Sequence, residues 1–209
     1  MAKELAREAG YIYVDTGAMY RAVSLFCLQN GWMTETDMNA EEIEKRIQSI
    51  RIEFKPNAEG KADTYLNGKN VESEIRTLEV ANGASRVSTL GFVRHELVRQ
   101  QQLMGNEKGI VMDGRDIGTV VFPQAELKIF LTASPEVRAQ RRFDEMAAKG
   151  ETVNYNEVLA NVKERDDRDQ NRAESPLRKA DDSVVIDNSN LTRDEQREIL
   201  HMLFLERTI

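Results

Sequence analysis

The sequence predicts an α/β fold built around a parallel sheet, and two observations support this. Short apolar runs at 110–112, 127–131 and 183–187 each lead into turn residues, a pattern typical of buried parallel strands. Segments with helical periodicity lie between these runs. Strands that alternate with helices along a chain favour a parallel sheet covered by helices.

The chain begins with a predicted helix, because apolar residues recur at helical spacing over residues 1–9. Gly10 ends this helix, and the aromatic and β-branched residues 11–14 predict a strand. Asp-Thr-Gly at 15–17 then forms the turn into a helix over 18–29.

Residues 34–77 differ from the rest and predict an α+β insertion, largely antiparallel, hung on the main sheet. Isoleucines at helical spacing favour a helix over 41–50, and residues 51–54 alternate with period two. Asn67-Gly68 is a hairpin signal. The core domain is therefore expected to comprise 1–33 and 78–209, with 34–77 inserted.

The remaining segments complete the alternation of strands and helices. The helices predicted after the insertion cover 79–87, 91–104, 135–149, 155–171 and 192–206. Pro135 follows Ser134 at the start of the third of these helices, which suits the first turn of a helix.

Composition excludes several classes of protein. The 209 residues carry 29 basic and 36 acidic side chains, a net charge of −7, which disfavours general binding to nucleic acid or anionic membranes. The single cysteine, Cys27, lies in an apolar stretch and is expected to be a buried thiol. Two histidines, His95 and His201, give no metal-site pattern. No signal-peptide pattern or long apolar span is present, so we expect a cytoplasmic protein.

The strand at 110–112 is followed by Asp113, Arg115 and Asp116. Ligands of open α/β sheets bind beyond the carboxyl ends of the strands, so these charges are expected to face a site. The alternative is a charged turn with no ligand.

Arginines gather at a few places, above all in the run from Arg165 to Arg172. Arg165, Asp169 and Arg172 stand at i, i+4 and i+7, on one helix face. One possibility is a solvent-exposed helix with i,i+4 ion pairs. The other is a helix whose arginine side chains point toward the phosphates of a bound ligand. Arginine suits the second role because its planar fork binds phosphate oxygens bidentately.

Three long motifs favour the role in phosphate binding. They are DTGAMYR at 15–21, DGRDIGTVVFP at 113–123, and ERDDRD at 164–169 followed by Asn171-Arg172. In order and spacing they closely resemble bacterial cytidylate kinases, and the similarity covers essentially the whole chain. The resemblance implies a nucleoside monophosphate kinase of the P-loop fold that transfers the γ-phosphoryl group of ATP to CMP or dCMP with Mg²⁺. The segment 34–77 would be its monophosphate-binding insertion.

The resemblance also implies roles for particular side chains. Thr16 and Arg21 would lie by the substrate phosphate, Tyr20 would also bind the substrate, and Ser85, Arg94 and Asp116 would read the cytosine edge. Catalytic contacts to phosphates would come from Arg115, Arg165 and Arg172, with Arg165 and Asp169 also at the pentose. Arg141 and Arg142 would bind ATP at the start of a mobile lid, about 140–172; the alternative is a surface helix with no role in binding. Cytosine offers an amino donor and ring acceptors, which suit a carboxylate, an arginine and a hydroxyl.

One family motif is absent, because no G-x-x-x-x-G-K-S/T occurs in the 209 residues. Relatives carry a strand and this loop just before the helix that here starts at Met1. We therefore expect the natural protein to carry roughly 15–20 more residues, the usual size of one strand and such a loop. The chain as written is expected to show little kinase activity.

Two alternatives remain open on the sequence. One is an inactive nucleotide-binding remnant, and the other is a kinase of the same fold for another monophosphate. We expect a monomer whose partners are ATP and CMP or dCMP, without nucleic acid or membrane binding.

Overall fold

The computed structural model describes residues 1–172 and 174–208, and it contains two compact units. The N-terminal unit comprises Ala2–Gly114, and the C-terminal unit comprises Met1 and Arg115–Ile209. The division falls within the charged turn after the strand at 110–112. The insertion 34–77 folds inside the N-terminal unit, and its separation from a core domain stays a prediction.

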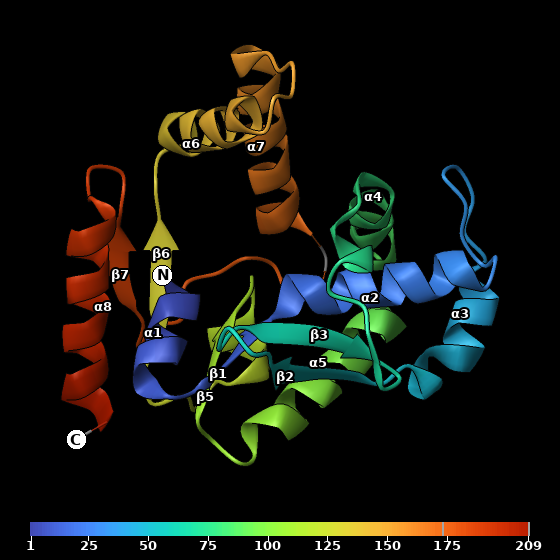
Figure 1. Cartoon of the computed structure of the whole chain (residues 1–209), viewed down its shortest axis with the longest axis horizontal. Helices are drawn as coiled ribbons and strands as arrows, with labels where there is room; N and C mark the ends of the chain where they lie inside the picture. Colours follow the sequence, from blue (N-terminus) through green and yellow to red (C-terminus); the bar gives the residue numbers. More distant parts are fainter. Residues whose placement is uncertain (173, 209) are drawn as a thin grey trace. The chain divides into compact units, whose positions relative to one another are not determined.

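The N-terminal unit carries both parallel and antiparallel strands (Figure 1). Its helices are α1 (Ala2–Ala9), α2 (Thr16–Gln29), α3 (Ala40–Arg46), α4 (Leu78–Val87) and α5 (Gly91–Gly105), with short 3₁₀ turns η1 (Ile47–Ser49) and η2 (Glu74–Arg76). Its strands are β1 (Ile12–Asp15), β2 (Ile52–Pro56), β3 (Ala62–Leu66), β4 (Lys69–Asn70) and β5 (Ile110–Asp113).

Strands β1 and β5 pair in parallel, with Ile12 opposite Ile110 and Asp15 opposite Asp113. The predicted α/β class with parallel strands is therefore confirmed. Strands β2, β3 and β4 form an antiparallel sheet, as predicted for the insertion. Asn67 and Gly68 both adopt positive φ, 48° and 83°, as a tight hairpin turn between β3 and β4 requires.

One apolar core holds the N-terminal unit together. The largest of its fully buried side chains include Met19 of α2, Ile52 of β2 and Leu97 of α5. Helix α4 packs closely on α2 at Gly83, where an added Cβ would lie 2.2 Å from Ser24 Oγ. Glycine is therefore needed at this crossing.

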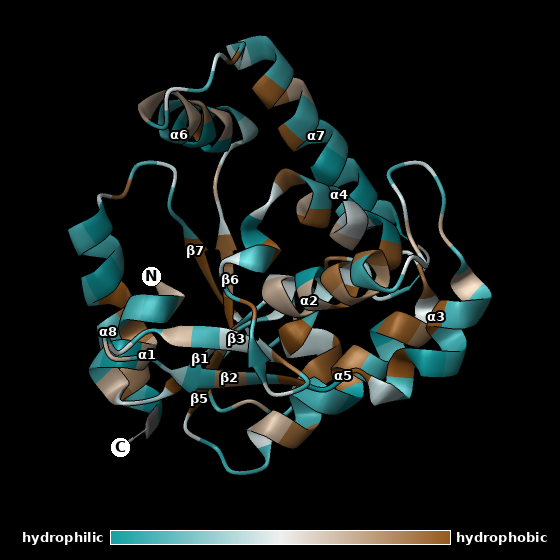
Figure 2. Ribbon diagram, turned by 45° about the vertical axis from the view of Figure 1, so that its right-hand side comes forward, coloured by the Kyte–Doolittle hydropathy of each residue, from teal (hydrophilic) through white to brown (hydrophobic). Residues whose placement is uncertain are grey.

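The C-terminal unit contains a second parallel pair. Its elements are a π-helical turn η3 (Ile117–Val121), strands β6 (Ile129–Thr132) and β7 (Val184–Asp187), and helices α6 (Pro135–Ala148), α7 (Tyr155–Asn171) and α8 (Arg193–Thr208). Ile129 lies opposite Val184, and the pairing continues to Thr132 and Asp187. Helices α6 and α7 pack together through Ala139, Val158 and Val162. Most of α7 is hydrophilic (Figure 2).

Two predicted elements need correction, and one element was not predicted. The helix predicted to reach residue 50 ends at Arg46, and η1 continues the chain. The strand predicted from 127 begins at Ile129. Residues 117–121 form a π-helical turn that the sequence did not predict. Ile43, Ile47 and Ile50 are all buried, so their spacing reflects contact with the core and not an unbroken helix.

Candidate functional site

Polar groups collect where β1 and β5 end in the N-terminal unit. The register places Asp15 opposite Asp113 at the carboxyl ends of two parallel strands, the expected place for a ligand site. Thr16, which is 7% exposed, donates its Oγ1 hydrogen to the backbone oxygen of Asp113 at 2.7 Å. Tyr13 donates to Asp113 Oδ2 at 2.8 Å, and burial together with this carboxylate raises the pKa of Tyr13 well above its ordinary value.

Helix α2 carries the predicted phosphate-binding residues. Asp15 caps it, because its Oδ1 accepts a hydrogen bond from Ala18 N at 3.0 Å. Arg21, one turn further along, donates from Nη1 to the backbone oxygen of Ile75 at 3.3 Å. Tyr20 is partly buried and packs against the core.

The two residues of this unit that are predicted to recognise cytosine differ in their exposure to solvent. Ser85 is exposed on α4, the helix that Gly83 fixes against α2. Arg94 is 5% exposed on α5. A guanidinium buried this deeply needs polar or charged partners, and its side chain has little conformational freedom left to lose when it binds a ligand.

A network that the sequence did not predict lies near the start of α2. Arg76 contacts Glu72 through Nη2–Oε1 at 2.5 Å and Nε–Oε1 at 3.0 Å, and it contacts Asp15 Oδ2 through Nη1 at 3.4 Å. Glu72 in turn accepts from Thr64. The i,i+4 spacing of Glu72 and Arg76 is a visible signal, but nothing in the sequence indicates Asp15 as a partner.

In the C-terminal unit the structure brings the predicted catalytic arginines together with two carboxylates. Arg115 Nε donates to Asp169 Oδ2 at 2.7 Å, and Arg165 Nε lies 3.9 Å from the same oxygen. Arg172 Nη2 lies 3.6 Å from Asp116 Oδ2. Two ion pairs thus connect residues 115–116 with the end of α7. We call Arg115, Arg165 and Arg172 the arginine cluster.

Arg172 follows the last residue of α7 and therefore does not share the helical face predicted for it. Its backbone is extended, with φ −62° and ψ 144°. Its Nε donates to the backbone oxygen of Ser175 at 2.7 Å, and Nη2 donates to the same oxygen. The fork is held from two sides, by Ser175 and by Asp116.

The electrostatics of the arginine cluster favour an anion. Burial and the charge of Arg115 lower the pKa of Arg165, with smaller contributions from Arg142 and Arg168, although 58% of the Arg165 side chain is exposed. Asp169 only partly offsets this repulsion. A bound phosphate would offset it further, because its oxygens supply the missing negative charge.

The two arginines predicted to bind ATP lie on α6. Arg141 donates to Asn188 Oδ1 at 3.0 Å and to Asn188 O at 2.7 Å, just beyond β7. Arg142 donates to Asn161 Oδ1 of α7 at 3.1 Å. Their predicted roles stay predictions. Arg138, in the same group, forms a bidentate pair with Asp166 at 2.7 and 2.5 Å that fastens α6 to α7.

The described part of the chain offers neither a cluster of metal ligands nor a membrane-spanning helix. Residues 1–172 and 174–208 contain no group of three or more His, Cys, Asp or Glu side chains that could hold a metal ion. Within the same residues, no helix is long and apolar enough to cross a membrane.

Parallel strand pairs that alternate with helices define an α/β protein, and the carboxyl ends of such strands are the usual place for a ligand site. The cytidylate kinase family model matches residues 1–204. The chain is 59% identical to the cytidylate kinase of Bacteroides thetaiotaomicron over 98% of its own length and 90% of that protein. It is 62% identical to that of Parabacteroides distasonis, over 94% and 86%, and 55% identical to that of Porphyromonas gingivalis, over 100% and 91%. The chain belongs to the cytidylate kinase family.

Proposed function

We propose that the protein transfers the γ-phosphoryl group of ATP to CMP or dCMP, producing ADP and CDP or dCDP. Family membership supports the reaction class, and the names of the relatives support the substrate. The structural observation that carries the proposal is the arginine cluster, whose members are held by Asp169 and Asp116.

The arginine cluster suits phosphoryl transfer, which asks a protein mainly for positioning and for cations around the transferring oxygens. A guanidinium has five N–H donors, so Arg115 keeps donors for a phosphate while its Nε holds Asp169. The carboxylates fix the arginines before the substrate arrives, and less reorganisation is then needed during the reaction. Arg165 and Asp169 also bind the pentose hydroxyls in this proposal.

Base recognition is assigned to Asp116, Arg94 and Ser85. The cytosine amino group is a donor that a carboxylate accepts, whereas uracil presents an oxygen acceptor at the same position. The side chain of Asp116 is only 13% exposed, which strengthens its hydrogen bonds and its repulsion of an acceptor. Thr16 and Arg21 bind the substrate's phosphate in the same proposal, and Tyr20 also contributes to substrate binding.

Mg²⁺ enters with ATP. Nucleotide enzymes usually bind this ion through phosphate oxygens and one or two carboxylates, so no dedicated cage of side chains is needed. Asp113, at the carboxyl end of β5, is a carboxylate of the required kind. When bound, Mg²⁺ would neutralise phosphate charge.

Arg141 and Arg142 bind ATP in this proposal. The enzyme acts as a cytoplasmic monomer.

Base preference tests the proposal most simply. Calorimetry should rank CMP and dCMP above UMP and AMP, and Asp116→Asn should reduce the ratio of CMP to UMP affinity by about tenfold or more, because an amide can donate to the uracil oxygen. Asp167→Asn on α7 is the control, since Asp167 contacts Asn171 and has no assigned role in binding.

Three results would count against the proposal. Tighter binding of UMP or AMP by the unmodified protein would indicate a kinase for another monophosphate. An unchanged CMP to UMP ratio in Asp116→Asn would remove Asp116 from base recognition. Binding of CMP without phosphoryl transfer by the unmodified protein would favour an inactive nucleotide-binding protein.

A further inference from the structure

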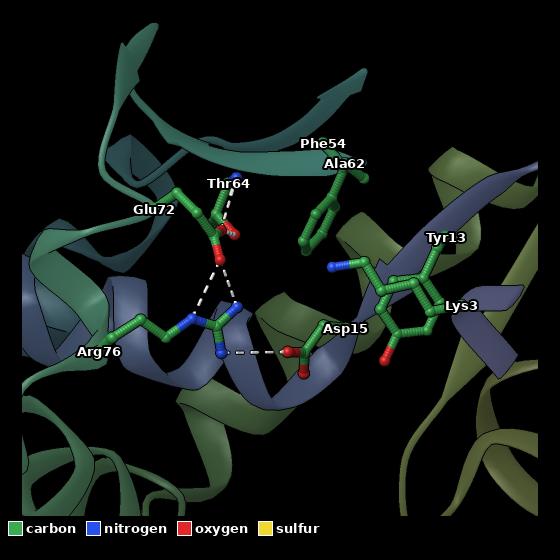
Figure 3. Close-up of a pocket in the computed structure, with 8 residues that line it drawn as sticks. All are labelled: Lys3, Tyr13, Asp15, Phe54, Ala62, Thr64, Glu72 and Arg76. Carbon is green, nitrogen blue, oxygen red and sulfur yellow. Dashed lines mark hydrogen bonds and ion pairs between the residues drawn. The ribbon is translucent and has the colours of Figure 1, made fainter. Parts of the chain in front are cut away.

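The network around Arg76 connects the insertion to the start of α2 within the N-terminal unit. Strand β3 contributes Thr64, whose backbone N and Oγ1 donate to Glu72 Oε2 at 3.0 and 2.7 Å. The other oxygen of Glu72 accepts from Arg76, and Arg76 reaches Asp15 (Figure 3). Each link is a charged hydrogen bond or an ion pair, a kind of contact stronger than a neutral hydrogen bond.

Asp15 is the residue through which this network can reach the substrate. One carboxylate oxygen caps α2 at Ala18, and the other accepts from Arg76. Thr16 follows directly and Arg21 lies on the same helix. A carboxylate held on both oxygens fixes the first turn of the helix, whose N–H groups and positive dipole end are suited to bind phosphate.

A second connection reaches Arg21 itself. The backbone oxygen of Ile75, the residue before Arg76, accepts from Arg21 Nη1 at 3.3 Å. Ile75 is fully buried, so this carbonyl belongs to a fixed part of the chain. The turn η2 therefore contacts both the cap of α2 and the guanidinium predicted to bind phosphate.

The network lines a pocket, in which Thr64 is buried and Arg76 is partly exposed. Thr64, which is 1% exposed, anchors one end, and the pocket of about 370 Å³ is also lined by Lys3, Tyr13 and Phe54 (Figure 3). Burial alone would raise the pKa of Glu72, but the hydrogen bonds from Thr64 and Arg76 outweigh it and lower that pKa. Glu72 is therefore ionised when it holds Arg76.

We infer that Arg76 is a positioning residue. By joining Glu72 to Asp15, it holds Thr16 and Arg21 at the start of α2 in the conformation that binds the phosphate of the monophosphate substrate. Arg76 does not touch the reacting atoms in this inference. It rests on the proposed function, since it concerns affinity for CMP.

Arg76→Met keeps the length of the side chain and removes the charge. It should weaken CMP binding by about tenfold or more, because groups that are no longer held in the binding conformation must be ordered when the ligand binds. Turnover at saturating CMP and KM for ATP should change by less than about twofold, because the lost interaction concerns one substrate. The CMP affinity of Arg76→Lys should lie between those of Arg76→Met and the unmodified protein, because lysine keeps the positive charge but lacks the planar guanidinium fork.

Arg99→Met is the matched control. Arg99 also forms a bidentate pair with a glutamate, at 2.8 and 2.6 Å to Glu96, and its side chain is 58% exposed against 45% for Arg76. Its loss should lower thermal stability and leave CMP affinity unchanged. Glu72→Gln should weaken CMP binding in the same direction as Arg76→Met, and the double variant should lose no more than the stronger single one.

The outcomes separate the inference from the proposed function. Normal CMP affinity in Arg76→Met, with a stability loss like that of Arg99→Met, would show that Arg76 is merely structural. If Arg76→Met does not fold, Arg76→Lys and Glu72→Gln decide by the same criterion. Failure of the unmodified protein to bind CMP would overturn the proposed function, and this inference with it.

Discussion

Replacing Asp169 by asparagine tests the arginine cluster most sharply. The Asp169 side chain is 17% exposed, and one of its oxygens accepts from Arg115 at 2.7 Å and faces Arg165 at 3.9 Å. Asparagine preserves the shape and removes the charge. Because 42% of Arg115 and 58% of Arg165 are exposed, the lost attraction is close to that of a surface pair, about 1 kcal/mol. For a chain of this size, that corresponds to a fall in Tm of about 2–4 °C.

The effect on catalysis should exceed the effect on stability. Without Asp169, Arg115 and Arg165 repel each other and lose their common anchor, so kcat/KM for CMP should fall by about tenfold or more. Glu164→Gln is the control, because Glu164 pairs with Arg168 on the same helix at 2.8 Å with both side chains exposed. A steady-state assay and a thermal melt on both variants suffice. Equal activities in Asp169→Asn and Glu164→Gln would refute the reasoning.

Three further predictions follow from single residues. Arg172→Lys should lower kcat strongly, because lysine cannot reproduce the fork that meets Ser175; a change confined to KM for CMP would make Arg172 a substrate clamp only. Burial raises the pKa of the Cys27 thiol to about 12, so iodoacetamide at pH 8 should label it only after unfolding, and rapid labelling of the folded protein would contradict its burial. The hydrogen bond from Arg138 lowers the pKa of Asp166 below its ordinary 3.8, so the pair stabilises the fold above that pH and loses this contribution as the pH falls through the lowered value. Asp166→Asn should therefore cost about 1 kcal/mol at pH 7 and progressively less in acid, as measured by urea unfolding; a loss independent of pH would contradict the assignment.

Much of the secondary structure could be predicted because local signals and burial agree. The helix over 155–171 was predicted to the residue, since Asn154 caps it and its polar pattern is continuous. The π-helical turn at 117–121 has no such signal, because its apolar residues do not repeat with a recognisable period. The end of α3 was placed four residues too far along, because buried isoleucines continue beyond the helix.

The candidate site was predictable to the extent that topology determines it. The rule for parallel strands led to Asp113, and the i,i+4 spacing led to Arg165 and Asp169. The contact between Asp15 and Arg76 spans 61 residues, and the contact between Arg115 and Asp169 spans 54. Such pairs depend on how the chain folds back, which no local pattern encodes. The roles of Ser85 and Arg94 rest on the family resemblance.

The most direct test of the account is transfer of labelled phosphate. The protein, incubated with Mg²⁺, ATP labelled at the γ-phosphate and an equimolar mixture of CMP, UMP and AMP, should label CDP well before UDP. The account predicts CDP as the main labelled product, with ADP formed in equal amount. Labelled UDP as the main product, or ATP consumed with no labelled diphosphate, would contradict it.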